Sequence, residues 1–206
     1  VTPEQGPDAP FDEVTAFAAT LGVQPDVRWS AQVVESADGL PFIGAPDPER
    51  RLFLATGFSG NGMTFGTLAA MILSDALLGR QNPYAHLYRA HRFNAAALPQ
   101  VVSENLGTAA HLIGGHLLPV SHAPVADIPT GAGRILKLNG EKLAVYRDVD
   151  GAVHAVSAIC THQGCQVAFN PLERSWDCPC HGSRFGIDGQ VLDGPATKPL
   201  AKREAR

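Results

Sequence analysis

All four cysteines of this 206-residue chain lie in two short segments that also carry histidines, and this clustering is the strongest constraint on its fold. In chain order, the six residues are Cys160, His162, Cys165, Cys178, Cys180 and His181. A Cys-x-His pair and a Cys-x-x-His pair together offer two thiolates and two imidazoles. Each pair needs its own tight loop to bring both side chains to one metal centre, and Gly164, Pro179 and Gly182 are typical turn residues. The sequence therefore predicts two short loops that are able to hold a metal centre.

Three kinds of site use these residue types. In a two-iron cluster, thiolates stabilise ferric iron and neutral imidazoles raise the reduction potential. A tetrahedral zinc ion also accepts sulfur and nitrogen, although zinc fingers usually pair Cys with Cys and His with His, whereas the two types alternate here. Two plain disulfides would use the cysteines but would leave the neighbouring histidines unexplained. The pattern favours the iron–sulfur cluster over the other two.

With these motifs, residues 125–206 resemble a Rieske 2Fe–2S domain. The resemblance implies a small all-β domain at the C-terminus of the chain. It also implies that Cys160 and Cys178 hold one iron of the cluster, and that His162 and His181 hold the other.

The second pair of cysteines is similar to that of the Rieske proteins in cytochrome bc complexes. In that subtype, cysteines at the places of Cys165 and Cys180 form a disulfide between the loops, whereas ring-hydroxylating oxygenases generally lack the pair. Ser183 matches a hydroxyl that donates to a bridging sulfide. Phe185 stands where high-potential members carry a tyrosine that donates to a cysteine sulfur. A missing donor lowers the potential, so we expect a value below the top of the roughly −150 to +300 mV Rieske range.

Short apolar runs around the loops predict β-strands. Residues 134–138 and 142–147 flank Asn139-Gly140, and an Asn-Gly pair between two short strands is the strongest local signal for a hairpin. Residues 153–156 predict a third strand that leads into the first loop. Residues 194–200 contain two prolines and resemble the loop that covers the cluster in Rieske domains.

The first hundred residues carry a different pattern. Residues 51–56 predict a strand, a glycine-rich turn follows, and residues 68–78 predict a helix that ends at Gly79. Such a turn places free backbone N–H groups at a helix N-terminus, where they stabilise an anion. Glycine-rich turns before helices are common, so this signal is weak when taken alone.

Together with its neighbours, the turn resembles the C-terminal part of FAD-dependent amine and amino-acid oxidases. The matching segments are 29–32, 38–44 and 57–64, and the similarity extends from about residue 11 to residue 93. It implies that the turn lies beside the flavin. The FAD-contacting residues expected from it are Gly60, Asn61, Gly62, Met63 and Thr64.

Two departures limit that resemblance. No Gly-x-Gly-x-x-Gly motif follows a strand, so we expect FAD to bind only together with an N-terminal half that this sequence lacks. Many members that oxidise amino acids carry an arginine for the substrate carboxylate on the strand near Gln32 and Val33, and neither of these residues is able to form that ion pair, so the substrate class stays open. The predicted fold class is thus mixed. An α+β oxidoreductase-like segment (1–101) precedes a linker (102–124) and the all-β Rieske domain (125–206).

Composition narrows the remaining functions. A net charge of −4 gives no reason to expect nucleic acid, and no apolar run approaches the ~20 residues that span a bilayer. We expect a cytoplasmic protein, although the chain begins with valine and a signal peptide is not testable from it. The expected partner is a redox protein or a flavin domain, and the oligomeric state stays open.

The favoured function is electron transfer as the C-terminal part of a flavin-dependent oxidoreductase, in which FAD passes electrons singly to the cluster. Only electron transfer should remain in the segment itself. One alternative is a stand-alone Rieske ferredoxin with a non-catalytic docking segment. Another is the Rieske part of an oxygenase, which the second cysteine pair and the lack of a convincing facial His/His/carboxylate site disfavour.

Overall fold

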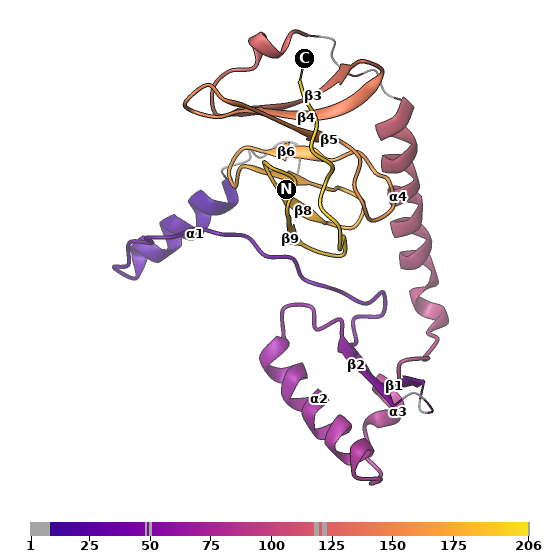
Figure 1. The fold of residues 1–206 in the computed structure, drawn as a ribbon. Coiled ribbons are helices and arrows are strands. Elements are labelled where there is room, and N and C mark those ends of the chain that lie inside the picture. The colour runs from indigo at the N-terminus through magenta and orange to yellow at the C-terminus, as the bar shows by residue number, and fades with distance from the viewer. Residues whose placement is uncertain (1–8, 48, 50, 118–119, 121–122, 206) are drawn as a thin grey trace. The chain divides into compact units, whose positions relative to one another are not determined.

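The strands form three antiparallel sheets that are divided between two units of the chain (Figure 1). The computed structural model describes residues 9–47, 49, 51–117, 120 and 123–205. One unit comprises residues 1–30 and 107–206 and contains two sheets, and residues 31–106 form the other unit with the third sheet.

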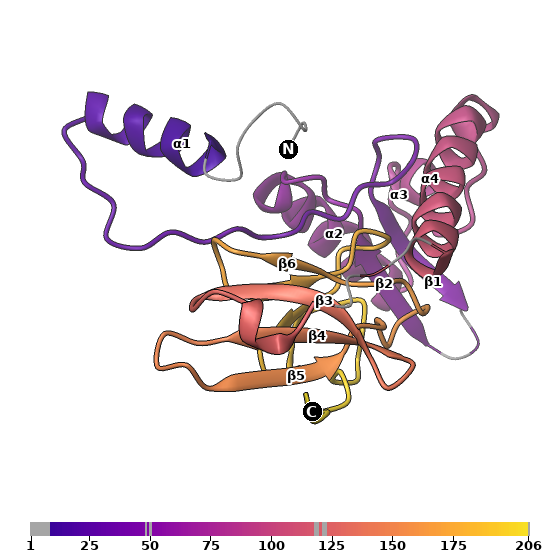
Figure 2. The ribbon, with the colours of Figure 1, turned by 90° about the horizontal axis from the view of Figure 1, so that it is seen from above.

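The first sheet of the larger unit is a meander of β3 (Ala132–Leu138), β4 (Glu141–Arg147) and β5 (Val153–Ser157), seen from above in Figure 2. Asn139 and Gly140 join β3 to β4 with φ values of 50° and 81°. A two-residue hairpin turn of the I′ type requires positive φ at both positions, which explains the Asn-Gly pair. The three predicted strands are confirmed within these bounds.

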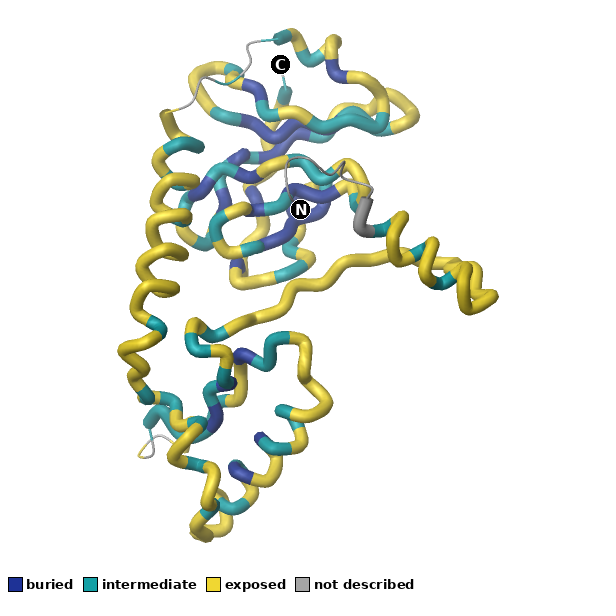
Figure 3. The backbone as a smooth tube through the Cα atoms, turned by 180° about the vertical axis from the view of Figure 1, so that it is seen from behind, coloured by how far each residue is buried: buried dark blue, intermediate teal, exposed yellow. Residues whose placement is uncertain are grey.

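The second sheet has the order β6-β7-β8-β9. Its strands are β6 (Ala168–Asn170), β7 (Ser175–Asp177), β8 (Arg184–Gly186) and β9 (Val191–Asp193). Phe169, Trp176 and Phe185 stand opposite one another on β6, β7 and β8. Trp176 and Phe185 are fully buried, and the ring centroids of Phe169 and Trp176 are 5.1 Å apart. This aromatic row anchors the core of the unit, where buried residues gather in Figure 3.

Helices flank these sheets in the sequence. They are α1 (Ala9–Thr20), the 3₁₀ turn η1 (Ala95–Ala97), α4 (Leu98–Leu117) and the 3₁₀ turn η2 (Val125–Asp127). Most of the linker that we predict at 102–124 is therefore helical. Residues 118–119 and 121–122 of it, and the first eight residues of the predicted oxidoreductase-like segment, lie outside the described residues.

The smaller unit consists of β1 (Phe42–Asp47), β2 (Leu52–Thr56), α2 (Gly62–Leu77), α3 (Ala85–Tyr88) and the first part of α4. Strand β2 confirms the predicted strand. The predicted helix of residues 68–78 corresponds to α2, which ends one residue earlier and begins six residues earlier because the glycine-rich turn itself enters the helix. Gly79 ends it as expected: its φ is 67°, and its N–H and that of Arg80 bond to the last free carbonyls, those of Ala76 and Asp75.

A buried ion pair organises the turn before β1. Arg92 donates to both carboxylate oxygens of Asp38 at 2.6 Å, and its guanidinium carbon lies 4.0 Å from the ring centroid of Phe42. Less than a tenth of either charged side chain is exposed. The hydrogen bonds from Arg92 hold the pKa of Asp38 well below its usual range, although burial opposes the shift.

Candidate metal centre

Two loops with similar turns carry the residues of the Cys/His motifs. The loops join β5 to β6 and β7 to β8. In the first, the N–H of Gly164 donates to the carbonyl of Cys160 at 3.0 Å, and in the second the N–H of Gly182 donates to that of Cys178 at 2.9 Å. Both glycines have the positive φ that a side chain disfavours, 83° and 76°. The glycines thus make the turns that the sequence predicts.

Side chains of the same type lie close to one another across the two loops. Cys160 and Cys178 are free thiols, both almost fully buried, and they lie near enough to interact. His162 and His181 form a second pair, with ring centroids 4.8 Å apart and the rings nearly perpendicular. Each loop therefore contributes one thiol and one imidazole. Among the four residues that the sequence predicts as ligands, the structure brings the two thiols together and the two imidazoles together.

The chemistry of these four groups suits a metal cluster. The Nδ1 atom of His162 is buried and has no hydrogen-bond partner among the described residues, which is costly unless another group binds it. Burial, together with the neighbouring Cys160, raises the pKa of the Cys178 thiol. Partial burial and the nearby His162 lower the pKa of His181, which favours the neutral ring that binds metals. A bound cation would stabilise the thiolate forms of Cys160 and Cys178, and would thereby offset the free-energy cost of ionising two adjacent thiols.

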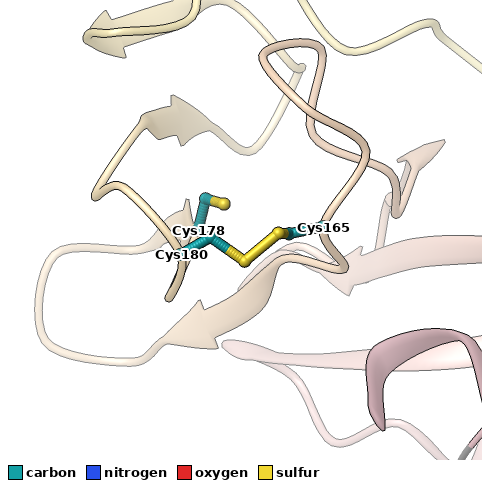
Figure 4. A group of neighbouring side chains, drawn as sticks. All are labelled: Cys165, Cys178 and Cys180. Carbon is teal, nitrogen blue, oxygen red and sulfur yellow. A yellow bond between two sulfur atoms is a disulfide. The ribbon is translucent and has the colours of Figure 1, made fainter. Parts of the chain in front are cut away.

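The other two cysteines form the expected disulfide. Cys165 and Cys180 are bonded, with their Cα atoms 6.5 Å apart, and they link the two loops covalently (Figure 4). The sulfur of Cys178 lies within 4.8 Å of both disulfide sulfurs. Because a disulfide sulfur carries no thiolate charge, Cys178 is the only one of these three that is available as a ligand.

The segment with two prolines contacts both loops. Ser183 Oγ accepts a hydrogen bond from the N–H of Ala196 at 2.9 Å, and Thr161 Oγ1 donates to the carbonyl of Lys198 at 2.6 Å. The Ser183 hydroxyl proton stays available for another acceptor. Phe185, the second residue predicted to tune the potential, is fully buried in the core beside the second loop. The tuning roles of Ser183 and Phe185 stay predictions.

The residues expected to contact FAD lie in the smaller unit. Gly60 and Asn61 form the turn after β2, and Gly62, Met63 and Thr64 are the first residues of α2. The first N–H groups of a helix lack partners within it, which is the physical basis of the anion binding that we predict at this turn. Met63 is 92% exposed. The proposed contact with FAD stays a prediction.

Sequence reasoning missed some supporting residues. Arg184 is buried directly after Ser183 and forms ion pairs with Glu173, Asp177 and Asp193. Lys142 bonds to both a helix end and the first loop. Long-range partners of this kind leave no local pattern, so neither contact was predictable from the spacing of residues.

Models of two protein families match the chain. The Rieske [2Fe-2S] domain matches residues 119–204, and the FAD dependent oxidoreductase family matches residues 9–76. The cytochrome b6-f complex iron-sulfur subunit of Prochlorococcus marinus is 31% identical over 158 residues, which cover 76% of this chain and 78% of that protein. The chain belongs to the Rieske [2Fe-2S] family. Its cofactor is accordingly a Rieske 2Fe–2S cluster, and its all-β part is the Rieske domain.

Other Rieske proteins are much longer than the matched region. The iron-sulfur protein YhfW of Bacillus subtilis (strain 168) is 40% identical over 185 residues, 88% of this chain and 36% of that protein. The cytochrome b6-f iron-sulfur subunit of Chlorobaculum tepidum is 39% identical over 83 residues, 40% of this chain and 45% of that protein. The chain thus spans less than half the length of these two relatives.

Among solved structures, the plasma membrane Rieske protein PetC3 from Synechocystis PCC 6803 is 32% identical, with a TM-score of 0.36. The match covers 41% of this Rieske chain and 86% of that one. In the described residues, no helix is both long enough and apolar enough to cross a membrane.

Proposed function

We propose that this chain transfers single electrons through a cluster held by Cys160 and Cys178 on one iron, and by His162 and His181 on the other. The observation that carries the proposal is the pairing of like ligands across the two loops. A 2Fe–2S cluster with this ligand set exchanges one electron at a time at a potential raised by the imidazoles. The family to which the chain belongs supports the same assignment.

The protein groups around the site have separate tasks in this proposal. Burial of the two thiols keeps water and oxidants from the sulfur ligands. Cys165–Cys180 and the contacts of residues 194–200 hold the loops at a fixed separation. His181 is exposed, so its ring edge is the shortest route for an electron to a partner on the surface.

We further propose that residues 1–101 are the C-terminal part of a flavin oxidoreductase and that the Rieske domain accepts its electrons. FAD takes two electrons from an amine-like substrate, and a one-electron acceptor removes them singly. The oxidoreductase match at residues 9–76 supports this arrangement. So does YhfW, since an alignment of 185 residues extends well beyond the Rieske match. The redox partner would then be a flavin domain, in a protein that we expect in the cytoplasm.

Electron paramagnetic resonance of the dithionite-reduced chain tests the cluster. We expect the low average g-value of a Rieske centre, with iron and acid-labile sulfide in equal amounts. Cys178→Ser should abolish both, whereas the same exchange at Cys165 and Cys180 together should keep the signal. A colourless protein, or one loaded with zinc alone, would contradict the proposal.

The absorption spectrum of the longer natural protein tests the flavin. A flavin band that is bleached by an amine substrate, followed by reduction of the cluster, is the expected result. If the full protein contains no flavin, the chain is a stand-alone electron carrier instead, and residues 1–101 have no catalytic part. Cell fractionation tests the cytoplasmic location.

A further inference from the structure

One side of α4 lies against the Rieske domain along residues 107–117. Thr108, Leu112 and Gly115 are half-buried there, and their spacing of four and three residues places them on one side of a helix. Leu112 packs against the buried cluster of apolar residues that surrounds the metal centre. Ile113 and Leu117 are exposed. We call Thr108, Leu112 and Gly115 the docking face.

The docking face meets the first loop at Gly115. A Cβ atom at this position would lie 2.9 Å from Cβ of Gln166 and 3.4 Å from its backbone nitrogen, so any side chain forces a shift. On the next residue, His116 Nε2 donates to the carbonyl of Gly164 at 3.1 Å. The helix therefore touches the loop immediately beside Cys165.

Lys142 fastens the end of the helix to the same loop. Its ammonium group donates to the carbonyls of Gly115 and His116, which belong to the last turn of α4, and to Oε1 of Gln166 at 3.1 Å. Carbonyls at a helix C-terminus lack partners within the helix and carry partial negative charge, so a cation there is favourable. One side chain on β4 thus joins helix and loop.

At its other end, the docking face reaches the second loop. The carbonyl oxygen of Thr108 lies 4.0 Å from Sγ of Cys180. This contact is not a hydrogen bond, because a disulfide sulfur has no proton to donate. Cys165 is 1% exposed whereas Cys180 is only half-buried, so Cys180 is the sulfur that a reagent would reach first. The helix backbone lies beside that sulfur.

We propose that the docking face and Lys142 position the two cluster loops and screen the disulfide from thiols. The loop part of this inference rests on the proposed ligand set, but the screening does not. While α4 is docked, attack on Cys180 is slow. When the helix detaches, a thiolate bonds to the Cys180 sulfur and Cys165 leaves as a thiolate. A second thiol of the reagent then releases Cys180, so the protein gains two electrons and two protons and a dithiol becomes its disulfide.

A pair of glycines in α4 provides the test. Gly115→Ala forces the clash with Gln166, whereas a Cβ at Gly107 meets no atom within 4 Å. Both exchanges raise helix propensity equally, so their difference isolates docking. With dithiothreitol and mass-spectrometric trapping of thiols, we expect disulfide reduction about tenfold faster in Gly115→Ala and within about twofold of the parent in Gly107→Ala, since the rate follows the open population.

A pair of lysines allows the same test with substitutions outside the helix. Lys142→Met should accelerate reduction, Lys142→Arg should restore the parent rate, and Lys137→Met on the opposite strand position should leave it unchanged. In the variants that accelerate reduction, the midpoint potential of the cluster should also shift. Equal reduction rates in Gly115→Ala and Gly107→Ala would overturn the proposal. Absence of the Rieske signal would overturn only the cluster assignment, since the disulfide rates need no cluster.

Discussion

The larger unit of residues 1–30 and 107–206, which we call the Rieske unit, differs from the smaller unit of residues 31–106 mainly in how much apolar surface is buried inside each unit. Of the apolar side chains buried among the described residues, only those of Pro41, Ile43, Ala69 and Ile72 belong to the smaller unit. In the same unit Met63 is 92% and Leu77 68% exposed. A fold is stable alone when it buries enough apolar area to offset its lost conformational entropy. By that measure the Rieske unit is self-sufficient and the smaller unit is marginal.

The two units also use their polar groups differently. In the Rieske unit, the disulfide links the two loops of the metal centre, and Arg184, directly after the second loop, forms ion pairs with Glu173, Asp177 and Asp193. In the smaller unit, the strongest polar contact, between Arg92 and Asp38, supports a turn. The comparison indicates that the metal centre lies in the unit that has the larger core. We therefore expect the units to respond separately to substitution, denaturant and pH.

The largest expected effect comes from removing core side chains in each unit. Trp176→Ala should destabilise the Rieske unit by about 3–5 kcal/mol and cause loss of the cluster, because it deletes the centre of the aromatic row. Ile72→Ala should destabilise the smaller unit by about 2–5 kcal/mol and leave the cluster intact. Urea unfolding followed by cluster absorbance and by far-ultraviolet circular dichroism separates the two.

Independent behaviour predicts that Ile72→Ala moves the dichroism transition alone. If the substitution also moves the absorbance transition, the units unfold together and the contrast between them is wrong. Leu192→Ala is a matched control, because this side chain of the Rieske unit is half exposed and its loss should change neither transition appreciably.

Whether a feature of the fold was predictable depends on how far apart in the sequence the interacting residues lie. The Asn139-Gly140 hairpin, the glycine turns and the end of α2 follow from neighbours in the chain, so they were predictable. The resemblance of the Cys/His motifs to a known family predicts the ligand set, and it also predicts the disulfide of Cys165 and Cys180, which the structure contains. Residue types at short spacing carry this information.

The contacts that the sequence did not predict are long-range. Lys142 reaches the end of α4 across 26 residues of chain, and Arg184 gathers carboxylates from three strands or turns. Such contacts depend on which surfaces meet, and a single sequence does not state that. The start of α2 was also placed too late, because the glycines of the turn hid the first residues of the helix, which are exposed.

A smaller effect is expected at Phe185, the residue that distinguishes this centre from high-potential relatives. Phe185→Tyr adds a hydroxyl that we expect to donate to a cysteine sulfur and to stabilise the reduced cluster. The midpoint potential should rise by about 20–65 mV, the equivalent of one net hydrogen bond of about 0.5–1.5 kcal/mol. Protein-film voltammetry measures it directly.

Ser183→Ala supplies the opposite change. It removes the hydroxyl that we expect to donate to a bridging sulfide, so the potential should fall by a similar amount. The contact that its oxygen accepts from Ala196 is lost as well, so the melting temperature must be compared. An unchanged potential in Phe185→Tyr, with the cluster fully loaded, would show that no hydroxyl at this place reaches the sulfur.

The smallest expected effect concerns pH and His154 of the Rieske unit. His154 Nδ1 lies 2.8 Å from Asp188, and its Nε2 lies 3.3 Å from Asp148. The hydrogen bond with Asp188, followed by that with Asp148, raises the pKa of His154 above its usual value. A raised pKa in the folded state means that protonated His154 stabilises the fold. This contribution is full below the unfolded pKa of about 6.5 and disappears as the pH rises through the folded pKa.

In the smaller unit, the stability contributed by Asp38 should depend on pH with the opposite sign and in a more acidic range. The pKa of Asp38 is depressed in the folded state, so its contribution is present above the unfolded value and is lost only in strong acid. Between pH 5.5 and 8 we expect the free energy of unfolding of the Rieske unit to decrease slightly, because exposed ion pairs contribute little, and that of the smaller unit to stay constant. Urea titrations at several pH values measure both transitions. In His154→Asn the slope of the Rieske unit should change, and an unchanged slope would assign the pH dependence to another group.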